Sequence, residues 1–536
     1  MKIFTFDTTL RDGTQGESIS FSVDDKLVIA QKLDELGIDY IEGGWPGSNP
    51  KDKDFFERAK ELKLHHAKLT AFGATRFAKN AVHEDRNVAA LLAAGTPVIS
   101  IFGKSWELHT KRALGITEEE NLKLISETVK FLKDHGKEVV YDAEHFFDGY
   151  QANPAFALRT LEAAQKAGAD VLVLCDTNGG TLTGRLAEIV ADVRKRFDGV
   201  LGIHTHNDSD VAVANTLAAV EQGCTHVQGC MNGYGERCGN ANLASIIANL
   251  ELKLGHTTVG PEKLASLSTV ARFIAELANL PLRGDQPFVG HSAFAHKGGV
   301  HVSAVLKDNS TYEHVVPELI GNRQRVLVSD LSGRSNVLYK LKQHGLADRL
   351  SEDSRRELLE RIKEMEYLGY ELEAAEGTFE LLVREALNPG THFFDVEGYE
   401  VTTKSTGAVG SRSTATVNLR AQDGVHSATA SGHGPVHALD VCLRKCLSAL
   451  YPRISEVRLT DYKVRVLEPK KGSAARVRVL VEWSDHRKSW STVGVSDNVI
   501  EASWSALVDA IRLELMRLTE QDESVERAVE DYCWGV

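Results

Sequence analysis

The sequence Asp7-Thr8-Thr9-Leu10-Arg11-Asp12-Gly13-Thr14-Gln15 directly follows a short extended run that begins near Met1. An Arg-Asp-Gly step at the end of a strand places a cation and a carboxylate at the same point, so Arg11 and Asp12 are candidates for a functional site. An exposed Arg-Asp pair is also common on protein surfaces, where ion pairs are weak. The residues at the ends of the other strands decide between these two interpretations.

Eight strand-like runs alternate with helical patterns in the first half of the chain. The runs are residues 3–7, 38–42, 68–72, 97–102, 138–143, 171–175, 200–205 and 226–231. Eight such units within about 250 residues predict an α/β fold, the closed (β/α)8 TIM barrel. The alternative is a doubly wound open sheet, which usually has fewer strands and often a GxGxxG motif after the first strand, a motif absent here.

A barrel brings the carboxyl ends of its strands together on one face, so polar residues at those ends should form one site. Most strands here do end in polar residues, which are Arg11, Asp12, Glu42, Arg76, Lys104, Asp142, Glu144, His145, Asp176, Thr177, His204, His206 and the segment 232–240. This regularity favours a functional face over a chance set of surface charges.

The pair His204 and His206 is the strongest sign of a metal site. Residues i and i+2 of a strand point the same way, so both imidazoles can reach one ion. Asp12 after the first strand and Asn240 after the eighth become their neighbours once the barrel closes. Two imidazoles, a carboxylate and an amide oxygen suit Mg²⁺ or Mn²⁺, with Co²⁺ and Zn²⁺ as alternatives. Cys238 is interpreted as a small packing residue, although it could be a softer ligand.

Composition limits the classes of function. A chain of 536 residues with 42% apolar and 26% charged residues predicts a soluble protein of two or three domains. The net charge of -13 argues against nucleic-acid and anionic-membrane binding. No apolar run reaches the roughly 18 residues of a membrane span. The seven cysteines lack paired CxxC spacing, which suits reduced thiols. The first strand lies too near Met1 for a targeting segment, and the two observations together predict a cytoplasmic protein.

Three segments are predicted. Residues 1–280 form the barrel, 281–387 a covering arm and charged amphipathic helices, and 391–536 a terminal α+β domain after Asn388-Pro389-Gly390. The terminal domain contains a faint repeat of two strands, a loop and a helix. Its predicted elements are strands 415–419 and 425–430 with helix 436–450, and strands 476–483 and 489–495 with helix 499–516.

Three motifs resemble the signatures of the family of 2-isopropylmalate, homocitrate and citramalate synthases. They are Asp7 to Gln15, His204-Thr205-His206-Asn207-Asp208 and Gly233-Tyr234-Gly235-Glu236-Arg237-Cys238-Gly239-Asn240. Residues 42–50, 141–149 and 312–321 most resemble the citramalate synthase branch, and the likeness covers nearly the whole chain.

The resemblance implies a Claisen condensation of acetyl-CoA with pyruvate that gives (R)-citramalate and CoA, the first step of the pyruvate route to isoleucine. It implies Asp12, His204, His206 and Asn240 as metal ligands. Arg11, oriented by Glu42, would stabilise the developing oxyanion and bind substrate, and Thr177 would anchor the substrate carboxylate.

The family pattern also supplies a base for the acetyl methyl group. His301 stands at the position expected for it, with Glu144 and Tyr312 assisting. His291 and His296 are rivals for this role, and Val302-Ser303 is found where related synthases usually carry Gln-Asp. The CoA-binding residues are not located.

The resemblance further implies that the terminal domain forms a homodimer and binds an end-product effector, expected to be isoleucine; a purely dimerising domain is the alternative. Among other activities, 2-isopropylmalate synthase comes second and homocitrate synthase third. A related lyase would share the barrel and the metal. A non-enzymatic amino-acid sensor would need only the terminal domain.

Overall fold

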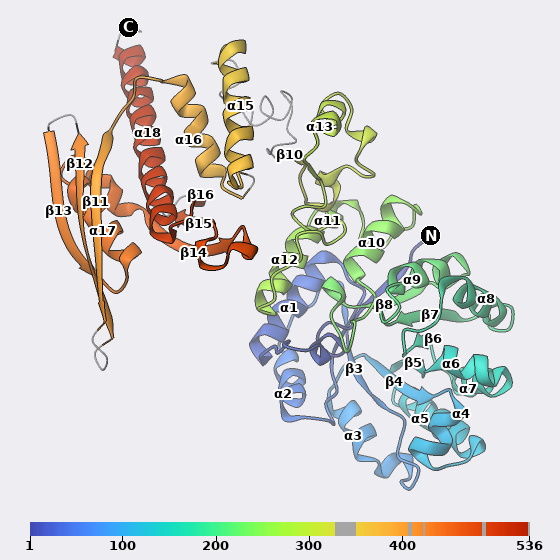
Figure 1. The fold of residues 1–536 in the computed structure, drawn as a ribbon. Helices are drawn as coiled ribbons and strands as arrows, with labels where there is room; N and C mark the ends of the chain where they lie inside the picture. The colour runs from blue at the N-terminus through green and yellow to red at the C-terminus, as the bar shows by residue number, and fades with distance from the viewer. Residues whose placement is uncertain (327–349, 373, 406–409, 422–423, 485–488, 534–536) are drawn as a thin grey trace. The chain divides into compact units, whose positions relative to one another are not determined.

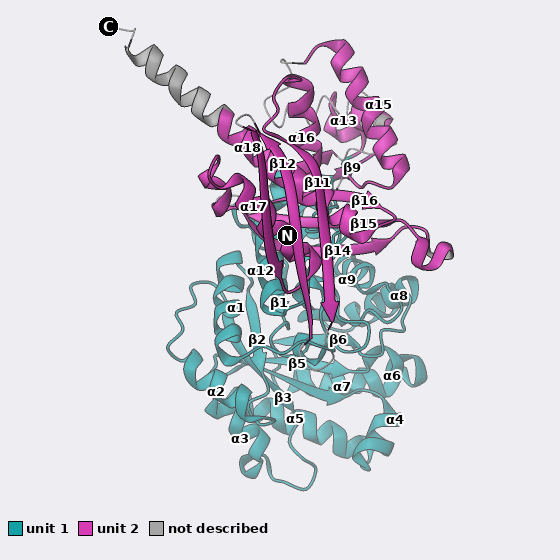
Figure 2. Cartoon of the chain, turned by 60° about the vertical axis from the view of Figure 1, so that its left-hand side comes forward, with its two compact units in different colours: residues 1–294, 313–324 teal, residues 295–312, 325–536 magenta. Residues whose placement is uncertain are grey.

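The computed structural model describes residues 1–326, 350–372, 374–405, 410–421, 424–484 and 489–533 of a chain that divides into two compact units. Unit 1 consists of residues 1–294 and 313–324, and unit 2 of residues 295–312 and 325–536 (Figure 2). Residues 327–331 of the predicted arm and 335–349 of the predicted helical segment lie outside the described residues. The predicted domain boundaries at 280, 387 and 391 stay predictions.

Eight parallel strands of unit 1 close into a barrel, which confirms the predicted fold and excludes the open sheet. They are β1 (Phe4–Asp7), β2 (Tyr40–Gly44), β3 (Lys68–Ala74), β4 (Val98–Lys104), β5 (Glu138–Glu144), β6 (Val171–Asp176), β7 (Val200–Thr205) and β8 (His226–Gly229). Strand β8 pairs with β1 from His226 opposite Phe4 to Gly229 opposite Asp7, and this pairing closes the sheet.

Helices surround the strands (Figure 1). They are α1 (Val23–Leu36), α2 (Pro50–Ala59), α3 (Arg86–Ala93), α4 (Glu107–His109), α5 (Glu118–Asp134), α6 (Phe146–Ala152), α7 (Pro154–Lys166), α8 (Thr183–Arg194), α9 (Ala212–Glu221), α10 (Leu243–Leu252), α11 (Pro261–Leu264) and α12 (Leu267–Leu277). At the start of α1, the Ser22 side chain accepts a hydrogen bond from the Asp25 amide and the Asp25 carboxylate accepts one from the Ser22 amide. This capping box satisfies amides that have no partner within the helix.

Apolar side chains on both faces of the strands hold the barrel together. One buried cluster consists of Phe6, Tyr40, Val98, Val140, Val171, Val173 and Cys175. The alternation of Val171, Val173 and Cys175 along β6 shows that this cluster takes one face of the strand. Leu172 and Leu174 of the same strand belong to the larger cluster that includes residues of the surrounding helices. Packing on both faces fixes the strand ends from which the site is built.

Unit 2 contains two three-stranded antiparallel sheets, each followed by a helix. The first has β11 (Phe394–Ser405), β12 (Ser411–Ala421) and β13 (Gly424–Gly432), followed by α17 (Pro435–Leu447). The second has β14 (Arg458–Val466), β15 (Val477–Ser484) and β16 (Ser489–Ser496), followed by α18 (Val499–Cys533). The predicted repeat is therefore present, but the prediction of two strands per repeat is wrong, because β11 and β14 were missed. Most residues of β14 are exposed, although Tyr462, Val464 and Val466 alternate with charged residues along it.

The rest of unit 2 is made of short or amphipathic elements. These are β9 (Ala295–His296), α13 (Gly299–Val305), β10 (Arg325–Val326), α15 (Glu352–Leu368) and α16 (Glu376–Leu387). In the described part of the chain, no helix combines the length and the apolar character that crossing a membrane requires.

Candidate metal centre at the carboxyl end of the barrel

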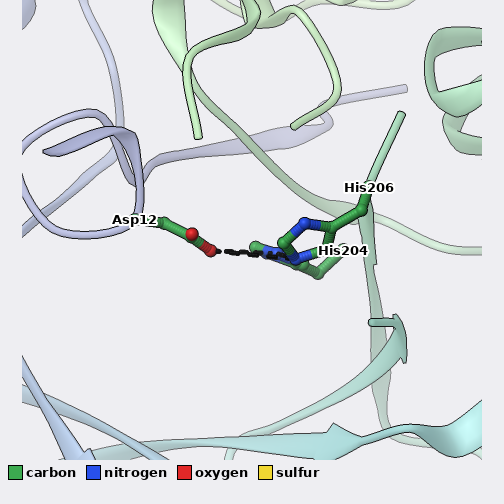
Figure 3. A group of neighbouring side chains, drawn as sticks. All are labelled: Asp12, His204 and His206. Carbon is green, nitrogen blue, oxygen red and sulfur yellow. Dashed lines mark hydrogen bonds and ion pairs between the residues drawn. The ribbon is translucent and has the colours of Figure 1, made fainter. Parts of the chain in front are cut away.

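Three buried side chains, Asp12 from the loop after β1 and His204 and His206 from the carboxyl end of β7 and the residues directly after it, converge on one point (Figure 3). Nε2 of His204 lies 3.4 Å from Oδ2 of Asp12, and Nε2 of His206 lies 4.0 Å from the same oxygen. The two Nε2 atoms are 3.2 Å apart. Thr205, between the histidines, turns away and donates its hydroxyl to the Ala212 carbonyl oxygen at 3.0 Å. The strand alternation therefore places both imidazoles together, as predicted.

Asn240 reaches this group through the loop after β8. An isolated antiparallel bridge pairs Asn240 with His206, and the Asn240 side chain donates from Nδ2 to the carbonyl oxygen of Tyr234 at 3.2 Å. Its Oδ1 is buried and has no hydrogen-bond partner in the described part of the chain. A Cβ atom at Gly239 would lie 2.0 Å from the Gly233 carbonyl oxygen, so glycine is required there to hold the loop.

This donor set fits a divalent cation. Asp12, His204 and His206 each offer one ligand atom, and these atoms lie within 4.8 Å of one another. The unpaired oxygen of Asn240 supplies a fourth candidate ligand. Two imidazoles with oxygen donors and no thiolate are suited to Mg²⁺, Mn²⁺, Co²⁺ or Zn²⁺.

Burial and neighbouring charges perturb the titration of these groups. Burial alone would raise the pKa of Asp12, but Arg11 and His204 hold it well below its ordinary value. Burial lowers the pKa of His206 to about 3, and the neighbouring His204 acts in the same direction. An ionised carboxylate and a neutral imidazole are the forms that bind a metal. The environment thus favours the binding form of both groups.

Arg11 is fixed beside this centre by three contacts. Its Nε donates to Oε2 of Glu42 at 2.6 Å, and its Nη1 lies 3.2 Å from Oδ2 of Asp12. Its guanidinium carbon stands 3.7 Å from the centre of the Phe72 ring, which is a cation–π contact. Burial raises the pKa of Glu42 to about 7, although Arg11 opposes the rise.

A cavity of about 350 Å³ opens at this face of the barrel. Arg11, Asp12, Glu144, Thr177, His204 and His206 all line it, so six of the ten predicted site residues share one space. Trp45, Phe72 and Phe102 form an aromatic wall in the same cavity, with ring centres 5.5 to 5.8 Å apart. Sequence reasoning missed this wall, although Phe72 and Phe102 lie near the ends of their strands.

Two polar residues of the cavity are held by partners that the sequence did not reveal. Glu144 forms an ion pair with Lys104, which stands opposite it in the register of β4 and β5. The hydroxyl oxygen of Thr177 accepts a hydrogen bond from the His145 amide at 2.8 Å. Arg237 donates to the Thr177 carbonyl oxygen at 2.8 Å and to both carboxylate oxygens of Asp208. Lys104 and Arg237, which stand among the polar residues predicted at the strand ends, thus orient residues of the cavity.

The remaining predicted residues, His301 and Tyr312, belong to unit 2. Their rings are stacked, with centres 4.3 Å apart and planes 27° from parallel. This contact joins the two residues for which the resemblance implied a shared role. Their part in proton abstraction stays a prediction.

Comparison with known proteins identifies relatives over the whole chain. Residues 2–271 match the HMGL-like family, 288–368 the "homocitrate synthase post-HMGL domain-like" family and 373–514 the "LeuA allosteric (dimerisation) domain". A protein of Aquifex aeolicus named (R)-citramalate synthase is 53% identical over 523 residues, which cover 97% of this chain and 99% of the relative. Its namesake of Geobacter sulfurreducens is 52% identical over 97% of this chain and 98% of the relative.

Proposed function

We propose that this chain, which belongs to the (R)-citramalate synthase family, condenses acetyl-CoA with pyruvate to give (R)-citramalate and CoA. The observation that carries the proposal is the identity of more than half of the residues, over nearly the full length, with relatives of that name. In the reaction the acetyl methyl carbon loses a proton and bonds to the keto carbon of pyruvate, and the keto oxygen gains a proton. Water then cleaves the thioester and releases CoA.

The barrel face offers groups for the pyruvate half of this reaction. A divalent ion, proposed to be Mg²⁺ or Mn²⁺, would be held by Asp12, His204, His206 and Asn240 and supplies Lewis-acid polarisation of the keto group. Arg11 keeps N–H donors beyond the one used by Glu42, and these can stabilise the oxyanion that forms at the keto oxygen. The Thr177 hydroxyl can donate to the pyruvate carboxylate, because its oxygen already accepts from His145.

The groups proposed for proton transfer are His301, Tyr312 and Glu144. Histidine suits removal of the methyl proton at neutral pH. The stacked ring of Tyr312 would orient His301, and the Lys104 ion pair would orient the Glu144 carboxylate.

The aromatic wall supports pyruvate as the acceptor. Trp45, Phe72 and Phe102 line one side of the cavity of about 350 Å³, and in this proposal they limit the size of the acceptor side chain. One extra methylene group in an apolar pocket changes specificity by about 10 to 200-fold. The near-full-length relatives at about 50% identity are named (R)-citramalate synthase, so the 2-isopropylmalate and homocitrate synthase alternatives are not favoured. The sensor alternative has no use for the donor set in the barrel, and the lyase alternative has less need of an allosteric domain.

The match to an allosteric dimerisation domain supports a homodimer that is regulated by isoleucine. Titration calorimetry of the intact protein tests this part, and a heat of isoleucine injection no larger than that of the buffer control would contradict it. Six of the seven cysteines, Cys175, Cys224, Cys230, Cys238, Cys442 and Cys446, are free and five of these six are buried, which supports a cytoplasmic location.

The decisive experiment is CoA-thiol release from acetyl-CoA and Mn²⁺ with pyruvate, 2-oxoisovalerate or 2-oxoglutarate, each repeated with a chelator. We expect chelator-sensitive release that is fastest with pyruvate, and (R)-citramalate as the product. Faster release with another 2-oxo acid would overturn the acceptor but keep the reaction class. No release with any acceptor would overturn the proposal.

A further inference from the structure

A chain of four buried side chains crosses the barrel interior beneath the metal centre. The Ser100 hydroxyl donates to Oδ2 of Asp142 at 2.7 Å, and Nε2 of Gln228 donates to Oδ1 of Asp142 at 3.0 Å. Oε1 of Gln228 lies 2.9 Å from Nδ1 of His204. These residues come from β4, β5, β8 and β7, and each is at most 5% exposed. These hydrogen bonds thus link β5 to β8, which are not neighbours in the barrel, and end at His204, a proposed metal ligand.

The donors and acceptors of these four side chains fix the direction of each hydrogen bond between them. A carboxylate only accepts hydrogen bonds, so both oxygens of Asp142 require donors. The amide nitrogen of Gln228 must therefore face Asp142, which leaves the amide oxygen facing His204. An amide oxygen only accepts, so Nδ1 of His204 carries a hydrogen. Nε2 is then the ring nitrogen that faces Asp12 at 3.4 Å and His206 at 3.2 Å, and it is the atom left to bind a metal. Burial raises the pKa of Asp142, and the hydrogen bonds from Ser100 and Gln228 oppose that rise.

The other histidine lacks this support. Nδ1 of His206 is buried and has no hydrogen-bond partner among the described residues. The barrel interior therefore fixes the ring of His204 through Nδ1, whereas no described residue holds the ring of His206 in this way. A metal-binding histidine commonly donates its other ring N–H to a fixed acceptor, which sets its tautomer and its orientation.

We propose that Gln228, supported by Asp142 and Ser100, is a positioning residue that holds His204 in the tautomer and orientation that bind the metal. This inference rests on the proposed metal-dependent function. Gln228 touches neither substrate nor metal and acts only through His204. The role predicts a change in metal affinity, with little change in turnover once the metal saturates the enzyme.

The test compares Mn²⁺ affinity of the intact protein by titration calorimetry in four forms. Gln228→Met keeps the length of the side chain but removes the acceptor, and we expect its Kd to rise by about 10 to 100-fold. Gln228→Glu retains an oxygen for the Nδ1 hydrogen, and we expect its Kd to stay nearer the wild-type value than that of Gln228→Met. Thr70→Val is the matched control, because Thr70 is a buried hydroxyl of β3 without a hydrogen-bond partner in the described part of the chain.

Turnover against Mn²⁺ concentration supplies the second measurement. For Gln228→Met we expect the half-saturating Mn²⁺ concentration to rise in parallel with Kd, while kcat at saturation stays within about threefold of wild type. Unchanged Mn²⁺ affinity in Gln228→Met, or equal weakening in Thr70→Val, would overturn the inference. A wild-type protein that binds Mn²⁺ but condenses no 2-oxo acid contradicts the proposed function alone. A wild-type protein that binds no Mn²⁺ contradicts both.

Discussion

Nε of Arg11 donates to Oε2 of Glu42 over 2.6 Å, and the Glu42 side chain is wholly buried. This ion pair joins the loop after β1 to the strand β2 and turns the guanidinium toward the cavity. Nε is thereby used for orientation and Nη1 lies against Asp12, and the remaining N–H donors of the guanidinium stay available to a substrate oxygen.

Arg11→Lys should therefore be severely damaging although it conserves charge. An ammonium is a point charge that cannot both pair with Glu42 and stack its donors over Phe72. We expect kcat to fall by about 10² to 10³-fold, as when an oxyanion donor is lost. CoA release at saturating pyruvate measures the effect, and Mn²⁺ calorimetry should show binding retained. A variant with near-normal kcat would remove Arg11 from transition-state stabilisation.

Asp12→Ala should lose metal and activity together. Removal of the carboxylate leaves two imidazoles and an amide as ligands, and a Lewis acid contributes several kcal/mol to such a reaction. We expect no Mn²⁺ binding by calorimetry and a fall in CoA release of about 10³-fold or more. Asp39→Ala changes a carboxylate that is absent from the cavity lining and is the control. Full activity of Asp12→Ala in the presence of chelator would exclude the metal site.

His301→Ala should separate binding from turnover. If His301 removes the methyl proton, we expect kcat to fall by about 10² to 10⁴-fold, with unchanged Mn²⁺ and pyruvate binding. His296→Ala is the matched control from the same arm, and its turnover should remain. Equal kcat values for wild type and His301→Ala would exclude this residue, and loss of turnover in His296→Ala would favour the rival.

Phe102→Ala should broaden the choice of acceptor. The substitution removes one ring of the aromatic wall but leaves Phe72, which stacks on Arg11. We expect the ratio of kcat/KM for 2-oxoisovalerate to that for pyruvate to rise by about 10-fold or more. Phe77→Ala, at an exposed ring outside the cavity, should leave the ratio unchanged. A ratio equal to wild type in Phe102→Ala would place the acceptor side chain elsewhere.

Acid should weaken unit 2 through Glu380. This carboxylate of α16 pairs with Arg517 of α18 and with Arg384, and although burial alone would raise its pKa, these partners lower it to about 2. A lowered pKa gives stability that is present above pH 4.5, the ordinary value, and is lost as pH falls toward 2.

Urea unfolding between pH 6 and pH 3 measures this effect against Glu380→Gln. The stability difference between wild type and variant should shrink by up to about 1.4 kcal/mol per pH unit below pH 4.5. A difference that stays constant over this range would mean that Glu380 has an ordinary pKa in the folded protein.

Much of the barrel and its metal group could be predicted from the sequence, because both depend on local periodicity. Buried runs at regular intervals predict the strands, and the i, i+2 spacing of His204 and His206 predicts their common direction. Closure of the barrel then brings Asp12 beside them.

The contacts that orient the site residues could not be predicted in the same way. The Lys104–Glu144 pair depends on the register of β4 with β5, and the sequence of one strand alone does not determine that register. Gln228 is an ordinary polar residue in the sequence until Asp142 and His204 lie on either side of it. The strands β11 and β14 were missed because so many of their residues face solvent.

The pairing of β1 with β8 closes the barrel and also completes the group of candidate metal ligands. Asp12 and the two histidines are separated by nearly two hundred residues in the sequence, and the closed sheet brings them together. The three ligand atoms are therefore brought together by the closed barrel, and an open sheet would not hold them at one point. An ion bound there favours the closed state by mass action, so the stability of the barrel should rise with the concentration of the metal.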